Sequence, residues 1–154
     1  MATAEAGVIA AGEHRLPLRV YYEDTDAGGV VYHAGYLRFA ERGRTEMLRC
    51  LGLEHGALRA HLGLAFAVRR CVIDYLAPAR LDDRIEVRTG LARLGGASLD
   101  LEQRIVREER MLARLEVRLA VISSALRAVR LPPALIEALA PLRHDAAANF
   151  SGGA

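Results

Sequence analysis

Residues 21–33 read YYEDTDAGGVVYH, and the rest of the chain is organised around them. Upstream, alternate apolar residues from Leu16 to Tyr22 fall on one face, which predicts a strand over about residues 15–22. Two adjacent glycines after a run of acids indicate a turn, because glycine adopts positive φ freely. A helix is predicted from about Gly35 to Leu51. An acidic loop therefore precedes the N-terminus of a helix.

That position has a chemical use. The first N–H groups of a helix have no partner within it, and the positive end of the helix dipole lies there. A reaction that develops negative charge on an oxygen atom can use both. The same residues are also typical of an ordinary turn. A calcium loop is disfavoured, because Asp24 and Asp26 lack the later ligands and the closing Glu of an EF-hand.

Downstream of the helix the pattern changes to strands. Four are predicted, at about 66–76, 84–94, 97–107 and 111–123, after a connector at 53–64 with some helical character. Their alternation of apolar and charged residues is typical of an antiparallel sheet with one covered face. Gly95-Gly96 predicts a two-residue hairpin loop. One long helix and one sheet must bury each other's apolar faces, which predicts an α+β fold.

The predicted helix has two notable features. An apolar stripe is expected at Leu37, Ala40, Met47 and Leu51. Gly43 lies in the helix interior, where it costs about 1 kcal/mol relative to Ala. Close approach of another backbone is a plausible compensation.

Composition sets the broad class. The chain has 154 residues, 52% hydrophobic and 26% charged, which predicts a single globular domain. Residues 1–14 are expected to form a flexible arm, 15–140 the domain with a short helix near Pro133, and 141–154 a mobile tail. The net charge of +2 gives no argument for nucleic-acid binding. No apolar run approaches the length needed to cross a bilayer and no signal peptide is evident, so a cytoplasmic location is expected.

The stretch 20–33, continued by YLRFAERGRTEML at 36–48, closely resembles acyl-CoA thioesterases of the 4-hydroxybenzoyl-CoA thioesterase family. The bacterial subgroup associated with the Tol–Pal system is the most similar. The likeness spans roughly residues 16–124 and continues through DYLAPARLDD at 74–83, ASL at 97–99 and QRIV at 103–106. It implies the hotdog fold, an antiparallel β-sheet wrapped around one long central helix, assembled as a homodimer or homotetramer.

The resemblance also assigns catalytic roles. Asp26 corresponds to the family's catalytic acid, either a general base for water or a nucleophile that gives an acyl-enzyme anhydride. The backbone N–H of His33 corresponds to the donor to the carbonyl oxygen, and the His33 side chain could orient substrate. Tyr22 corresponds to an assisting tyrosine. Structural interpretations stay open: His33 as a helix-start residue bonded to nearby backbone, and Tyr22 as a core aromatic ending a strand.

Substrate contacts are expected in two places. Gly28, Gly29 and Val30 form the loop beside the acid. Coenzyme A carries phosphates, so its entrance should be basic, and relatives often have a basic residue in the hairpin before Ser98, where this chain has glycines. The candidates for substrate contacts outside the loop are Arg69, Arg70, Arg80, Arg93 and Ser98.

The predicted function is hydrolysis of acyl-CoA to a free acid and CoA, with no metal and no cofactor beyond the CoA of the substrate. No Gly-x-Ser-x-Gly elbow is present. Cys50 and Cys71 are expected to be buried free thiols. The alternatives are a non-catalytic hotdog module that binds acyl-CoA or acyl carrier protein in envelope organisation, and a dehydratase. No nucleic-acid partner and no transmembrane segment are expected.

Overall fold

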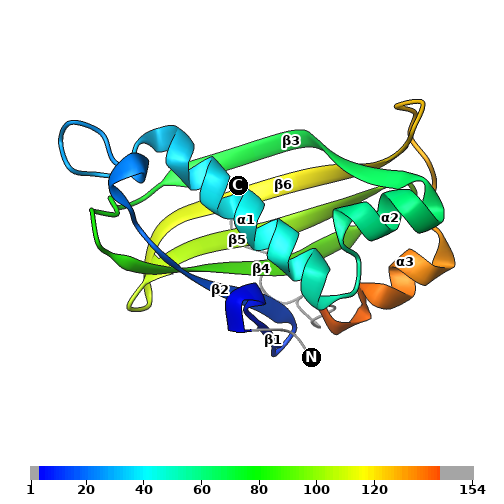
Figure 1. The fold of residues 1–154 in the computed structure, drawn as a ribbon, viewed down its shortest axis with the longest axis horizontal. Helices are drawn as coiled ribbons and strands as arrows, with labels where there is room; N and C mark the ends of the chain where they lie inside the picture. The colour runs from blue at the N-terminus through cyan, green and yellow to red at the C-terminus, as the bar shows by residue number, and fades with distance from the viewer. Residues whose placement is uncertain (1–3, 143–154) are drawn as a thin grey trace, which may run out of the picture.

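The computed structural model describes residues 4–142 of the chain. One long helix, α1 (His33–Cys50), lies across a six-stranded sheet in which every neighbouring pair is antiparallel (Figure 1). The strand order is β1-β2-β4-β5-β6-β3. The strands are β1 (Val8–Ala10), β2 (Glu13–Arg19), β3 (Leu64–Tyr75), β4 (Arg84–Leu94), β5 (Ser98–Arg107) and β6 (Arg110–Ser123). The shorter helices are η1 (Ala4–Ala6), η2 (Tyr22–Asp24), α2 (His55–Leu62), α3 (Pro133–Ala138) and η3 (Ala140–Leu142). This helix-on-sheet layer confirms the predicted α+β class.

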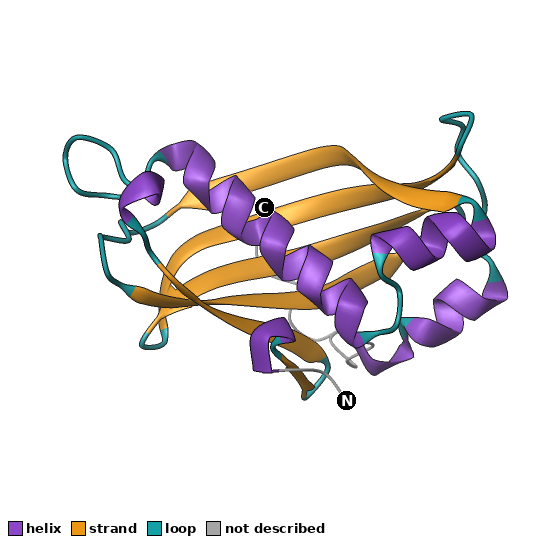
Figure 2. Cartoon of the chain, in the orientation of Figure 1, coloured by secondary structure: helices purple, strands orange, loops and turns teal. Residues whose placement is uncertain are grey.

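The sheet curls beneath α1 (Figure 2). Its register shifts at three places, between Val68 and Arg70, between Leu91 and Arg93, and at Ile105. Such bulges bend a strand and increase its twist, so they let a flat ladder wrap around a helix.

The helix α1 buries one side on this sheet. The buried residues recur three or four positions apart, as one helix face requires. They are Gly35, Tyr36, Phe39, Ala40, Gly43, Met47 and Leu48. The prediction that Leu37 belongs to this stripe is wrong, because its side chain is 41% exposed and the aromatic residues Tyr36 and Phe39 occupy the core side.

Gly43 lets α1 approach β4 closely. A Cβ atom at this position would lie 2.6 Å from Cγ1 of Val87. The close approach was expected, but the contact is made by a side chain and not by another backbone. Beside it, the buried Gln103 donates from Nε2 to Ala40 O and to Thr89 Oγ1, both at 2.9 Å. These bonds satisfy polar groups that the helix covers.

The strand before the acidic loop ends earlier than predicted. β2 stops at Arg19 and residues 22–24 form η2. Tyr22 is 83% exposed, so the interpretation of this residue as a core aromatic is wrong. Likewise, the link between β4 and β5 runs from 95 to 97, one residue longer than expected, and Gly95 N donates to Ser98 O at 2.7 Å.

The N-terminal residues differ from the expected flexible arm. Residues 8–14 contain β1 and the start of β2, which pair with each other. His14 is fully buried and donates from Nε2 to Ala6 O at 2.6 Å, which holds η1 against the domain. Residues 1–3 and 143–154, where the arm begins and most of the predicted tail lies, are outside the described residues. Within 4–142, no helix has the length and apolar character to cross a bilayer.

Candidate active site

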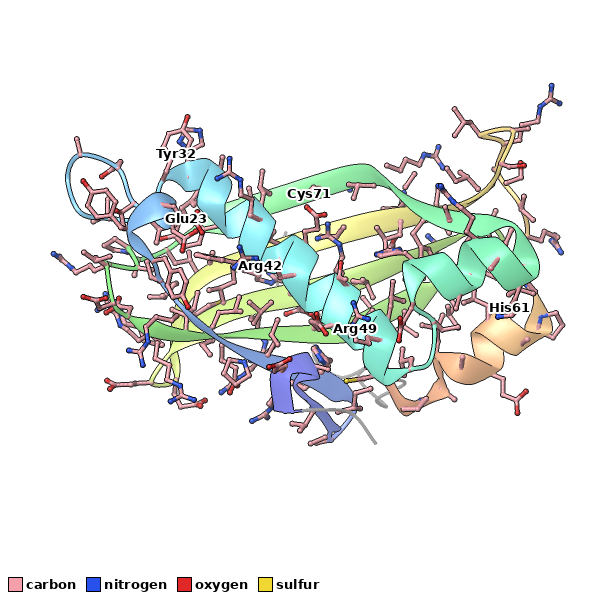
Figure 3. The ribbon with its side chains drawn as sticks, in the orientation of Figure 1. Glu23, Tyr32, Arg42, Arg49, His61 and Cys71 are labelled. Atoms are coloured by element: carbon pink, nitrogen blue, oxygen red, sulfur yellow. The ribbon has the colours of Figure 1, made fainter. Side chains whose placement is uncertain are left out.

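The acidic loop leaves η2 and returns to α1 as a narrow turn. Thr25 and Val31 form an isolated antiparallel bridge, and Asp26 N donates to Val30 O at 2.8 Å. At the tip, Gly29 has φ of +79° and donates its N–H to Asp26 O at 3.1 Å. In Figure 3, the labelled Glu23 and Tyr32 mark the two ends of this segment.

The loop rests on the segment that follows β3. Val31 N donates to Ala79 O at 2.9 Å, and Val30 forms a bridge with Arg80. Leu81 N donates to Gly29 O at 3.4 Å. These backbone contacts hold one side of the loop, and residues 26–29 remain exposed.

The two aspartates of the loop have different surroundings. Asp24 is buried, its Oδ2 accepts Tyr21 N–H at 2.8 Å, and its backbone oxygen accepts Tyr32 N–H at 3.0 Å. Asp26 is exposed, and its Oδ1 accepts Gly28 N–H at 2.8 Å. Asp24 therefore stabilises the loop structure, whereas Asp26 uses one carboxylate oxygen for a hydrogen bond within the loop and leaves the other open to solvent.

The start of α1 is open to a ligand. Its N-cap residue, Tyr32, makes no side-chain cap, and Gly35 N donates to Tyr32 O at 2.7 Å. No hydrogen bond within residues 4–142 uses the N–H of His33 or of Ala34. A Cβ at Gly35 would lie 2.9 Å from Val31 Cγ1, so glycine allows this open helix end to sit against the loop. Free N–H groups at a helix start attract negative charge on a ligand.

A groove of about 350 Å3 adjoins this helix end. Its lining is mostly apolar and aromatic, and comes from Val31, His33, Tyr36, Tyr75, Leu76, Ala77 and Pro78. The Tyr36 and Tyr75 rings meet edge to face with centroids 5.5 Å apart. Tyr36 Oη accepts Ala79 N–H at 2.9 Å, and Tyr75 Oη donates to His33 O at 3.0 Å. The sequence assigned these two tyrosines no role, because nothing in it pairs a residue at the helix start with one at the end of β3.

The predicted catalytic residues lie close together along the chain but make few mutual contacts. His33 is exposed and its ring packs on Tyr32, with centroids 4.2 Å apart. No hydrogen bond in the described part of the chain joins its side chain, or that of Tyr22, to Asp26. Their roles stay predictions.

The predicted substrate contacts fall into separate regions. Gly28, Gly29 and Val30 lie in the loop beside Asp26. Arg69 lies at the bulge of β3. Arg93 and Ser98 are at the far end of the sheet, about 30 Å along β4 from the loop, given about 3.3 Å per strand residue. One chain alone therefore does not bring Arg93 and Ser98 to Asp26, whereas Arg80 forms a bridge with Val30 of the loop.

Cysteine and metal chemistry have little support at this site. Cys50 and Cys71 are free, and partial desolvation raises the pKa of both thiols, which disfavours the nucleophilic thiolate. Cys71 is exposed on β3, contrary to the prediction that both thiols are buried. Among residues 4–142, no group of three or more His, Cys, Asp or Glu side chains is placed to hold a metal ion.

The chain is similar to several known proteins. The chain is 55% identical over 98 residues to an acyl-CoA thioester hydrolase, YbgC, of Escherichia coli O157:H7, which covers 64% of this chain and 72% of the relative. It is 49% identical over 106 residues to the acyl-CoA thioesterase YbgC of Haemophilus influenzae, over 69% of this chain and 78% of the relative. A crystal structure of a probable thioesterase from Bartonella henselae superposes with a TM-score of 0.75 at 41% identity, over 78% of this chain and 99% of that one.

The match to a family model is broader. The model of the thioesterase-like superfamily covers residues 20–139, which include the acidic loop, α1 and all strands from β3 to β6. Together with the antiparallel sheet around one helix, this confirms the resemblance and the hotdog fold that it implied. The chain belongs to the thioesterase-like superfamily.

Proposed function

We propose that this protein is an acyl-CoA thioesterase that hydrolyses the thioester to a free carboxylic acid and CoA. The observation that carries the proposal is the exposed Asp26 carboxylate on the loop that leads into the uncapped N-terminus of α1. The relatives named acyl-CoA thioester hydrolase and acyl-CoA thioesterase support the substrate class.

In the proposed reaction, the thioester carbonyl oxygen accepts the N–H of His33. Asp26 either removes a proton from an attacking water or attacks the carbonyl carbon itself. Either attack places negative charge on the carbonyl oxygen, where the helix start stabilises it. Collapse breaks the C–S bond and releases CoA, whose sulfur takes up a proton. In the second route, water then hydrolyses the Asp26 anhydride. No metal or cofactor is needed.

We expect the enzyme to work as a homodimer or homotetramer joined through β3. This strand is a 12-residue edge of the sheet, and Val68 on it is 52% exposed. A long edge with exposed apolar residues is a template for pairing with another strand. In an antiparallel β3–β3 pair, the end of β3 near Leu64 meets the end near Tyr75 of the other copy. The partner subunit's Arg93 and Ser98 would then approach Asp26 and supply the basic entrance for CoA.

A cytoplasmic location belongs to the proposal, since CoA thioesters and the free thiols of Cys50 and Cys71 fit a reducing compartment. Acyl carrier protein is a second possible carrier of the acyl group. The resemblance to the Tol–Pal-associated subgroup suggests a connection to the cell envelope.

The test is release of free thiol from acyl-CoAs of graded chain length and from aryl-CoAs, using the purified full chain. Hydrolysis of at least one of them supports the proposal, and the length profile measures the depth of the acyl pocket. The same panel on acyl carrier protein identifies the carrier. Binding of acyl-CoA without hydrolysis of any substrate would contradict the proposal and favour a binding module.

A further inference from the structure

We propose that Tyr75 is a positioning residue for the reaction, because its hydroxyl fixes and polarises the first peptide units of α1. The inference rests on the proposed thioesterase function. It concerns a residue on β3 that lies outside the acidic loop and is 42 positions from its partner in sequence.

The contact joins the sheet to the start of the helix. Tyr75 is the last residue of β3, and its Oη donates to His33 O at 3.0 Å. That carbonyl belongs to the peptide unit whose N–H is the free N–H of Ala34. A hydrogen bond accepted by a peptide carbonyl polarises the whole unit, so its N–H becomes a stronger donor.

The preceding peptide unit is held in the same way. Tyr32 O accepts the Gly35 N–H at 2.7 Å, and this unit carries the free N–H of His33. Both free donors at the helix start are therefore attached to carbonyls that accept a hydrogen bond. Two aligned donors can share the developing charge of one carbonyl oxygen. Of the two hydrogen bonds to these carbonyls, only the one from Tyr75 comes from outside the helix.

The tyrosine is itself well held. Its ring meets the Tyr36 ring at 74° with centroids 5.5 Å apart, and Tyr36 in turn packs edge to face on the buried Phe39. Tyr36 Oη is occupied by Ala79 N–H. The Tyr75 ring is nevertheless 48% exposed, since it lines the groove. A fixed ring at the groove wall keeps the hydroxyl aimed at the helix while substrate enters.

The test compares Tyr75→Phe with Tyr21→Phe. Tyr75→Phe keeps the ring and removes only the hydroxyl, and we expect kcat to fall about tenfold, below the effect of deleting a direct oxyanion donor. We expect KM to stay within about twofold and the melting temperature to change little. Tyr21→Phe removes an exposed hydroxyl near the loop and should leave kcat unchanged.

A second measurement does not depend on activity. In amide NMR spectra of the two variants, Tyr75→Phe should move the Ala34 amide proton upfield, whereas Tyr21→Phe should not. Three results would overturn the positioning role while leaving the proposed function intact. They are a wild-type kcat in Tyr75→Phe, a rise in KM as large as the fall in kcat, or an Ala34 amide proton whose chemical shift does not change. A wild-type protein that hydrolyses no thioester would instead overturn the proposed function, and this inference with it.

Discussion

At the scale of single residues, Gly29 controls the shape of the acidic loop. Its φ of +79° lies in the region that other residues enter at a cost of about 1–2 kcal/mol. A Cβ there would meet no atom within 4 Å, so the cost of a side chain is conformational and not steric. The residue therefore holds Asp26 and Val30 at the correct spacing through the turn.

Gly29→Ala should lower kcat/KM for acyl-CoA, because the strained loop populates other conformations and misplaces Asp26. The melting temperature should fall only slightly, since the loop is exposed. Gly52→Ala is the matched control, with φ of +73°, open space and a position beyond the C-terminus of α1. Equal activity losses in both variants, or none in Gly29→Ala, would refute the role of the loop.

His14 makes stability depend on pH. Burial lowers its pKa below the ordinary value of 6.5, against the opposing effects of its bond to Ala6 and the charge of Glu46. The fold therefore favours the neutral ring, whose Nδ1 has no partner among the described residues. This contribution to stability is full above about pH 6.5 and is lost as the pH falls through the lowered pKa.

Thermal melts between pH 7.5 and pH 5 check this behaviour. The wild type should lose more stability on acidification than His14→Gln, because glutamine can donate to Ala6 O without titrating. Parallel pH profiles for the two proteins would show that His14 does not carry the effect.

At the scale of elements, α1 and β4 pack through Gly43. Gly43→Ala should destabilise the fold, because the added Cβ would meet Val87 at 2.6 Å. Overpacking costs about 1–3 kcal/mol, whereas the better helix propensity of Ala returns about 1 kcal/mol. We expect a net loss of up to about 2 kcal/mol in the free energy of unfolding.

Gly56→Ala in α2 is the control for helix propensity, since its Cβ would meet no atom within 4 Å. Chemical denaturation should show it to be neutral or stabilised by up to about 1 kcal/mol. If both Gly43→Ala and Gly56→Ala were more stable than the wild type, the close packing of α1 on β4 would not require glycine at position 43.

The edge strand β3 is the second element with a testable role. Val68→Asp puts a charge among the exposed apolar residues of β3, which should favour the monomer. Sedimentation velocity should show this shift, and the activity should fall together with the fraction of assembled protein. Leu126→Asp changes a residue that is also exposed but lies beyond β6, so assembly should be unaffected. A Val68→Asp protein with the assembly state of the wild type would exclude the β3 interface.

At the scale of the whole molecule, sequence patterns predicted those strands and helices whose residues alternate regularly between apolar and polar. The bounds of β4 match the prediction at both ends, because charged and apolar residues alternate between two turn signals. β1 was missed, because it is only three residues long and depends on pairing with β2. The buried face of α1 is rotated relative to the predicted apolar stripe. The reason is that tyrosine is amphipathic, so the pattern did not place Tyr36 in the core.

The site residues also divide into those that a local sequence pattern predicts and those that depend on tertiary packing or assembly. Asp26, the glycines after it and the helix start are adjacent in sequence, so a contiguous motif was enough to predict a loop that leads directly into α1. The bond from Tyr75 to His33 depends on how β3 lies beside α1, which no local pattern encodes. Arg93 and Ser98 lie at the opposite end of the sheet, so their predicted role depends on assembly.

The most direct test of the central claim compares Asp26→Asn with Asp24→Asn in thiol release from the best acyl-CoA substrate. Asparagine at 26 can still accept the Gly28 N–H, so this variant should keep its melting temperature and lose activity by several orders of magnitude. Asp24→Asn weakens the part-buried hydrogen bond from Tyr21 N–H and should lower stability more than it lowers the rate of the folded enzyme. Wild-type thiol release by a folded Asp26→Asn protein would contradict the assignment of Asp26 as the catalytic acid.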